Sequence, residues 1–194
     1  MPEPRRDSLL TIPNLLTLSR LPLAVIMFAC IAHERWLAAL LVFGVASITD
    51  WLDGLLARRL NQQSAIGRSL DPLVDKVLTG GAFIYLMQVK DSLLLPWMVT
   101  VVIGRELLIT GIRGIMEAQG VKFGADWLGK LKMVLQCAVL VAMLAALWLQ
   151  SEFSLGDDGL KVLRYSQMGL IYAMLLATIA SGVRYVVRAG NQWR

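Results

Sequence analysis

Four aspartates lie within one short stretch of the chain, at a spacing suited to a cation site. They are Asp50, Asp53, Asp71 and Asp75, in the pattern D-x2-D-G-x2-A-R-x8-G-x3-D-x3-D. Apolar stretches flank this run on both sides. A carboxylate at the centre of a membrane helix costs roughly 2.5–3.5 kcal/mol on insertion scales, so such groups usually face an ion, a cavity or a substrate path. Four acids in one short run therefore indicate a bound cation.

The spacing predicts that these acids lie on two helix faces. Asp50 and Asp53 are three residues apart on one helix, and Asp71 and Asp75 are four apart on the next. A hairpin through residues 60–67 would let the two faces converge. Carboxylate oxygens without His or Cys suit hard cations such as Mg²⁺, Mn²⁺ or Ca²⁺. The single histidine, His33, is expected at the opposite side, which argues against zinc.

Two divalent ions held by such acids would clamp a diphosphate and assist an in-line displacement at phosphorus. Asp75, the last acid of the run, is the best-placed general base for an attacking hydroxyl. The alternative is that the acids only form ion pairs at a helix boundary, with Arg58, Arg59, Arg68 and Lys76. Four acids beside small residues favour the catalytic interpretation.

Gly54, Ala57 and Gly67 remove side-chain bulk beside the acids. Small residues let helices pack closely in membranes. They would equally admit a flat or phosphorylated ligand next to the metal ions. Arg58 lies beside them and offers a forked donor to phosphate.

The composition predicts an all-α membrane protein with a single domain, residues 1–194. The chain has 194 residues, 57% of them hydrophobic, and a mean hydropathy of +0.62. Soluble domains are about 45–50% apolar. The net charge of +5 does not indicate nucleic-acid binding, because no soluble basic domain is present to hold it. Six stretches are long enough to span a membrane: residues 12–31, 37–60, 68–89, 93–117, 127–149 and 160–187.

The basic residues predict the orientation of these spans. One side of the membrane receives most of them: Arg5, Arg6, Arg58, Arg59, Arg68, Arg113, Lys122, Lys130, Lys132, Arg184, Arg188 and Arg194. With an even number of spans, both termini are then cytoplasmic. The aspartate run therefore opens to the cytoplasm.

Basic residues in the second half of the chain suit an acceptor that carries its own phosphate. The candidates are Arg105, Arg113, Lys130 and Arg184. Arg105 and Arg113 are eight residues apart, on roughly one helix face. Glu106 is the alternative, structural partner of Arg105, and ordinary membrane topology is the simpler explanation of Lys132. For Ser181, a hydrogen bond between helices is expected.

The complete aspartate run resembles the signature of the CDP-alcohol phosphotransferases, with all eight fixed positions present. This resemblance implies a homodimeric enzyme of the bacterial inner membrane whose active site faces the cytoplasm. It implies transfer of a phosphatidyl group from CDP-diacylglycerol, or a related CDP-linked donor, to an alcohol, with release of CMP.

The same resemblance implies roles for single residues. Asp50, Asp53, Asp71 and Asp75 would bind two Mg²⁺ ions, with Mn²⁺ as the alternative metal, and Asp75 would also be the base. Gly54, Ala57 and Gly67 would shape the cytidine-diphosphate pocket, with Arg58 nearby. Asn14 would line the nucleotide site or cap a helix, and Arg20 would line that site or be a snorkelling anchor.

Three further stretches narrow the acceptor. IPNLLTLSR (12–20), GRELLITGIR (104–113) and GKLKMVLQ (129–136) resemble bacterial family members that use glycerol 3-phosphate. Met133 departs from this pattern, because a threonine often follows the second lysine. Inositol phosphate, serine and phosphatidylglycerol are the alternative acceptors. A cation channel or transporter, with the acids along its ion path, is the alternative from another class of protein.

Overall fold

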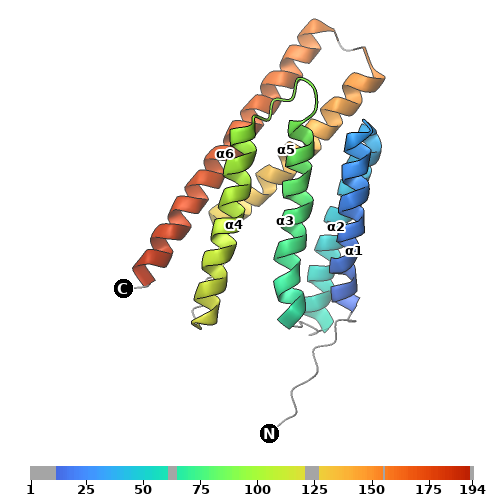
Figure 1. Cartoon of the computed structure of the whole chain (residues 1–194). Helices are drawn as coiled ribbons and strands as arrows, with labels where there is room; N and C mark the ends of the chain where they lie inside the picture. Colours follow the sequence, from blue (N-terminus) through green and yellow to red (C-terminus); the bar gives the residue numbers. More distant parts are fainter. Residues whose placement is uncertain (1–11, 61–64, 121–126, 155, 193–194) are drawn as a thin grey trace. The chain divides into compact units, whose positions relative to one another are not determined.

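The structure is a computed structural model. It describes the backbone of residues 12–60, 65–120, 127–154 and 156–192, and the side chains of residues 18–50, 52, 73–120, 127–154 and 156–191. These ranges contain six α-helices and no β-strand. The helices are α1 (Ile12–Ala32), α2 (Trp36–Leu60), α3 (Ala65–Met87), α4 (Pro96–Ala118), α5 (Trp127–Glu152) and α6 (Asp157–Gln192) (Figure 1). The predicted all-α class is confirmed.

The helices follow the apolar stretches of the sequence, and an informative difference lies between α5 and α6. Residues 150–159 are expected to be a polar connector, but α5 continues to Glu152 and α6 already begins at Asp157. Asp157 and Asp158 occupy the first turn of α6. Carboxylates are favourable there because the helix dipole is positive at its N-terminus. The acidic residues therefore start a helix instead of extending the loop.

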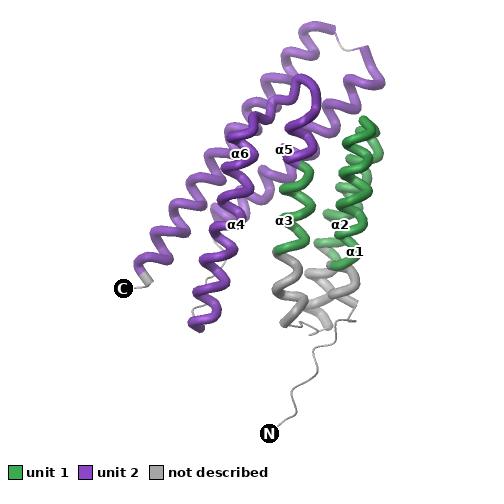
Figure 2. The backbone as a smooth tube through the Cα atoms, in the orientation of Figure 1, with its two compact units in different colours: residues 1–82 green, residues 83–194 purple. Residues whose placement is uncertain are grey.

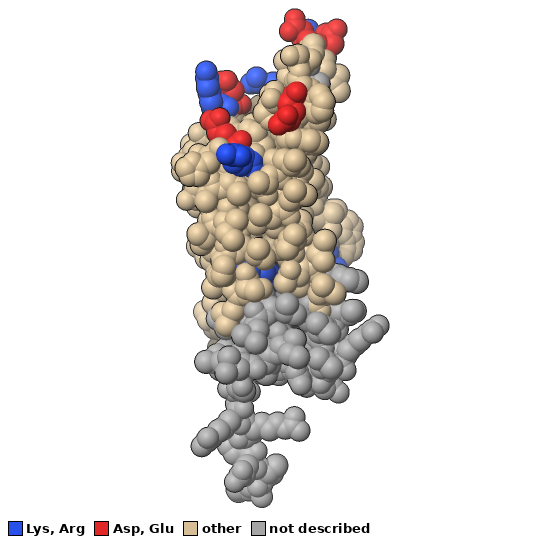
Figure 3. Space-filling model, turned by 90° about the vertical axis from the view of Figure 1, so that its right-hand side faces the viewer, with Lys and Arg blue, Asp and Glu red and all other residues tan. Residues whose placement is uncertain are grey.

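Within the described residues, two helical segments are long and apolar enough to cross a membrane, Trp127–Glu152 and Asp157–Asn191. Leu18–Ala32 and Trp36–Asp50 are shorter apolar segments. Uncharged side chains form most of the described surface on the face drawn in Figure 3. Six helices are thus confirmed, whereas six membrane crossings and cytoplasmic termini stay predictions.

The chain divides into two compact units, residues 1–82 and 83–194 (Figure 2). In the first unit α1 packs against α2. A short turn joins them, with Glu34 in the left-handed region at φ 57°. Met27 on α1 and Ala39 and Phe43 on α2 are buried. This pairing fixes the position of Asp50, which lies on α2, relative to α1.

Gly81 on α3 makes room for an aromatic ring of α1. A Cβ atom built on Gly81 would lie 2.2 Å from Cζ of Phe28. Gly81→Ala is expected to lower the free energy of unfolding by about 1–3 kcal/mol, because the ring must move away. Thermal unfolding in detergent measures this. Gly44→Ala is the matched control, since its Cβ would meet nothing within 4 Å. Equal melting temperatures for the two variants would contradict the expectation, and Gly81→Ala/Phe28→Leu should recover stability.

In the second unit α6 packs against both α4 and α5. Its buried contributors include Ile171, Met174 and Leu175, and those of α5 include Leu140 and Leu144. Val102 and Ile109 are buried on α4. These apolar side chains bring polar residues of all three helices into a common region.

Candidate active site

The structure places the four predicted metal ligands on two consecutive helices. Asp50 and Asp53 belong to α2, and Asp71 and Asp75 belong to α3. The predicted distribution of two acids on each helix is therefore confirmed. The side chains of Asp53 and Asp71 lie outside the described ones, so their part in a metal site stays a prediction.

Asp50 forms an ion pair with a buried arginine of α1. Nη1 of Arg20 donates to Oδ1 of Asp50, and the side chains are 1% and 46% exposed, respectively. The expected snorkelling role of Arg20 is wrong, because a buried guanidinium does not reach water. Arg20 instead neutralises part of the charge of Asp50 and orients its carboxylate. The arginines considered above as partners of the acids, Arg58, Arg59 and Arg68, have side chains outside the described ones, and Arg20 is the partner described for Asp50.

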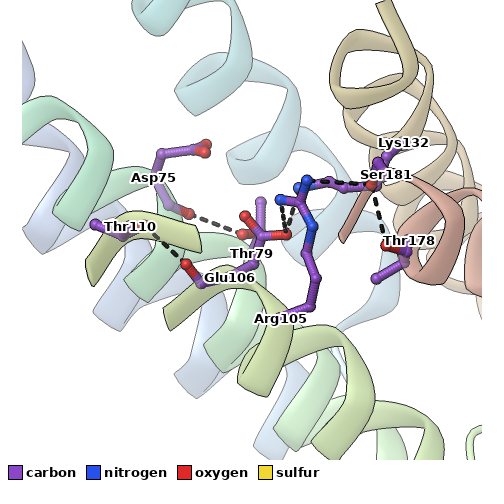
Figure 4. A network of polar contacts seen from close by, with 8 residues as sticks. All are labelled: Asp75, Thr79, Arg105, Glu106, Thr110, Lys132, Thr178 and Ser181. Carbon is purple, nitrogen blue, oxygen red and sulfur yellow. Dashed lines mark hydrogen bonds and ion pairs between the residues drawn. The ribbon is translucent and has the colours of Figure 1, made fainter. Parts of the chain in front are cut away.

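Asp75 is half-buried on α3. Its backbone carbonyl accepts a hydrogen bond of 2.9 Å from Oγ1 of Thr79, one turn further on (Figure 4). This bond engages the main chain and not the carboxylate. The role of Asp75 as a base stays a prediction.

The donor set fits a hard cation as far as it is described. Asp50 and Asp75 offer carboxylate oxygens, the donors that Mg²⁺ prefers. Among the described side chains, no three His, Cys, Asp or Glu come together as metal ligands. Five predicted residues of the donor site also have side chains outside the described ones: Asn14, Gly54, Ala57, Arg58 and Gly67. Their roles stay predictions.

The second unit contains a charged cluster formed by α4, α5 and α6 (Figure 4). Oε1 of Glu106 accepts from Nη1 of Arg105 at 3.1 Å and from Nζ of Lys132 at 2.5 Å. Nη2 of Arg105 donates to Oγ of Ser181 at 3.1 Å. The expected contact of Glu106 with Arg105 and the expected bond between helices at Ser181 are both confirmed.

The other predicted acceptor residues differ in their surroundings. Arg113 is exposed, and its guanidinium carbon lies 5.9 Å from the ring centroid of Tyr185 on α6. Arg105 and Arg113 thus both reach α6, as expected for residues on one face of α4. Lys130 and Arg184 are exposed on α5 and α6. Their binding of an acceptor stays a prediction.

Lys132 is the functional candidate that sequence reasoning missed. Membrane topology predicts a lysine at the water interface, but the Lys132 side chain is only 5% exposed and touches Glu106. The spacing of the two lysines in the sequence could have indicated this burial. Lys130 and Lys132 are two residues apart and so point to different sides of α5, and only one of these sides can face away from the neighbouring helices. Membrane topology alone therefore does not account for the burial of Lys132, whereas the topology itself stays a prediction.

Comparison with known proteins gives a consistent result. A family model described as CDP-alcohol phosphatidyltransferase matches residues 10–187. Three proteins named CDP-diacylglycerol–glycerol-3-phosphate 3-phosphatidyltransferase are similar to the chain. The Bacillus subtilis (strain 168) protein is 37% identical over 69% of this chain and 76% of its own length. The Escherichia coli (strain K12) protein is 33% identical over 92% of this chain and 94% of its own length. The Pseudomonas fluorescens protein is 39% identical over 57% of this chain and 58% of its own length.

Proposed function

The chain belongs to the CDP-alcohol phosphatidyltransferase family, and we propose that it transfers the phosphatidyl group of CDP-diacylglycerol to glycerol 3-phosphate. The products are phosphatidylglycerophosphate and CMP. The observation that supports this proposal most strongly is the similarity to the Escherichia coli relative over 92% of the chain, together with the complete aspartate run. Family membership decides between an enzyme and a cation channel in favour of the enzyme.

The acids of α2 and α3 are assigned to the donor side of the reaction. Asp50, Asp53, Asp71 and Asp75 would hold two Mg²⁺ ions, which stabilise charge on the diphosphate when bound. The ion pair with Arg20 supports this assignment for Asp50, because it presents the carboxylate in a fixed orientation. Gly54, Ala57, Gly67, Arg58 and Asn14 would form the cytidine-diphosphate pocket.

Asp75 acts as the general base in this proposal. Its carboxylate takes the proton of the acceptor hydroxyl, and the hydroxyl oxygen attacks the phosphorus of the phosphatidyl group. A new P–O bond forms to the acceptor, while the P–O bond to CMP breaks and CMP leaves with the electron pair. The partial burial of Asp75 on α3 is compatible with this role.

The basic residues of the second unit are assigned to the acceptor's phosphate. Arg105 supports this assignment most directly, because it is mostly buried yet carries a charge. Arg113, Lys130 and Arg184 would add further positive charge that attracts the acceptor's phosphate. A phosphorylated acceptor such as glycerol 3-phosphate suits this set, whereas serine would leave it without a phosphate partner.

The proposal includes a location and an assembly. We place the enzyme in the bacterial inner membrane with six crossings, cytoplasmic termini and a cytoplasmic active site, as a single domain that forms a homodimer. The two long apolar segments of α5 and α6 and the bacterial relatives support a membrane location. The excess of basic residues on one side supports the orientation.

An acceptor competition tests the function. Purified protein in vesicles with CDP-diacylglycerol and Mg²⁺ should release CMP at least about tenfold faster with glycerol 3-phosphate than with serine, because serine lacks the phosphate and its charged hydrogen bonds. Release should also be slower with inositol phosphate and phosphatidylglycerol, which carry a phosphate on a different alcohol. EDTA should abolish release, and Mg²⁺ or Mn²⁺ should restore it. Metal-dependent release that another alcohol drives faster would overturn the acceptor but keep the reaction class. Release that survives EDTA would overturn the metal ions.

A further inference from the structure

The charged cluster of the second unit lies among apolar side chains. Arg105 is 14% exposed, Glu106 16% and Lys132 5%. Buried apolar residues flank it along α4, among them Val102 and Ile109. Removing charges from water costs several kcal/mol for each ion unless partners compensate for it. The cluster therefore depends on the way in which its charges are paired.

The pairing runs through one oxygen atom. Oε1 of Glu106 accepts from both Arg105 and Lys132, so a single carboxylate holds two cations from two helices. Thr110 Oγ1 donates to the backbone carbonyl of Glu106 at 2.7 Å, which leaves the carboxylate itself to the cations. Glu106 therefore compensates one cation on its own helix, α4, and one on α5.

The guanidinium of Arg105 is also held from α6. Ser181 Oγ accepts from Arg105 and donates to the carbonyl of Thr178 at 3.0 Å, so its hydrogen already has an acceptor. A Cβ on Gly182 would lie 3.2 Å from Cγ of Arg105, so the absence of a side chain there leaves room for the arginine stem. Arg105 is therefore fixed between α4 and α6 before any substrate binds.

One feature leaves the cluster ready for a further anion. Nε of Arg105 is buried and has no hydrogen-bond partner within the described part of the chain. A phosphate brings several acceptor oxygens, so it could accept from this unused donor and from the cations that now share Glu106.

We propose that Glu106 is a positioning residue that occupies the phosphate's place between Arg105 and Lys132 and competes with the acceptor's phosphate for them. When no acceptor is bound, the carboxylate keeps both buried cations compensated and in place. When the phosphate arrives, it takes over these cations from Glu106. This inference rests on the proposed acceptor site and adds a residue that sets its affinity.

The test removes the charge but keeps the oxygen. In Glu106→Gln the amide oxygen still accepts hydrogen bonds, while the competing negative charge is gone. Glycerol 3-phosphate binding is measured by calorimetry on purified protein without CDP-diacylglycerol. The Kd should fall about tenfold, a cautious value for removing one charge a few ångströms from the bound anion. The unliganded variant should melt at a lower temperature than the wild type, and glycerol 3-phosphate should raise its Tm by more.

The matched control is Asp158→Asn. Asp158 pairs with Lys161 at 3.2 Å on the surface of α6, with side chains 98% and 65% exposed. The same charge is removed there, but solvent screens it, so the Kd should change less than about twofold. A tenfold fall in this control as well would show that overall charge, and not Glu106, controls binding.

Two further variants test the inference if Glu106→Gln does not fold. Lys132→Gln alone removes one of the two cations and should weaken binding about tenfold. Glu106→Gln/Lys132→Gln removes one negative and one positive charge together and should return the Kd to within about threefold of the wild type. A double variant as weak as Lys132→Gln overturns the role of Glu106.

The outcomes also separate this inference from the proposed function. If Arg105→Gln weakens binding of glycerol 3-phosphate while Glu106→Gln leaves the Kd unchanged or higher, the acceptor site stands and Glu106 is only structural. If neither variant changes the Kd, the acceptor site itself is wrong. In the wild type, acceptor-driven CMP release independently reports whether the enzyme uses glycerol 3-phosphate.

Discussion

Asp75→Asn is expected to lower kcat at least about a thousandfold, within the range that a general base contributes to catalysis. Asparagine has nearly the same shape as aspartate but cannot take a proton from the acceptor hydroxyl. The hydrogen bond from Thr79 to the Asp75 carbonyl involves the main chain, so the local helix should remain intact. CMP release at saturating substrates measures the loss.

Donor binding distinguishes a base from a metal ligand. Without acceptor there is no transfer, so binding of CDP-diacylglycerol with Mg²⁺ can be measured at equilibrium. Asp75→Asn should bind the donor nearly as well as the wild type. Asp50→Asn should bind it more weakly and require more Mg²⁺, because it would remove a proposed metal ligand, whose carboxylate Arg20 orients. Equal losses of donor binding in both variants would contradict a separate base role for Asp75.

A neutral control exists for the same substitution elsewhere in the chain. Asp91 is exposed between α3 and α4 and has a φ of 59°. Asparagine adopts this left-handed conformation readily. Asp91→Asn should therefore leave kcat, donor binding and melting temperature close to the wild-type values. A large loss of kcat in this control would mean that the assay reports folding and not catalysis.

The helices could be predicted from the sequence because their signal is local. Apolar runs of about 20 residues, separated by polar residues, give both ends of α1 and α2 to within one residue. The aspartates also fall on α2 and α3 as their spacing predicts. Local chemistry accounts for the early start of α6, since Asp157 stabilises the first turn of that helix.

The partners of the charged side chains could not be predicted, because they depend on which helices pack together. Arg20 and Asp50 are thirty residues apart, and nothing near Arg20 in the sequence distinguishes a buried pair from a snorkelling anchor. Lys132 has the same ambiguity. Its burial follows from the packing of α6 on α4 and α5, which brings polar residues of the three helices together. Such contacts became visible only in the folded chain.

Arg105→Gln is expected to raise the KM for glycerol 3-phosphate about a hundredfold, the upper range for loss of a charged hydrogen bond in a mostly buried site. The KM for CDP-diacylglycerol should change less than about twofold, because the donor is assigned to other residues. Steady-state CMP release, with each substrate varied in turn, separates the two constants.

Arg105→Lys shows whether charge or shape matters. Lysine keeps the positive charge, but it cannot bond Glu106 and Ser181 through two separate nitrogens as the guanidinium does. It should therefore recover only part of the affinity, with a KM about tenfold above the wild type. Arg164→Gln is the control on α6, because Arg164 is exposed and should have no effect on either KM.

The comparison of the KM values for the two substrates separates a binding role of Arg105 from a structural one. Arg105 holds together α4 and α6, so its loss lowers stability as well as binding. A purely structural defect would reduce the amount of active enzyme and thus kcat, with both KM values unchanged. A rise in the donor KM alone would instead move Arg105 to the nucleotide side. Only a selective rise in the acceptor KM agrees with a guanidinium that Glu106 and Ser181 hold ready for a phosphate.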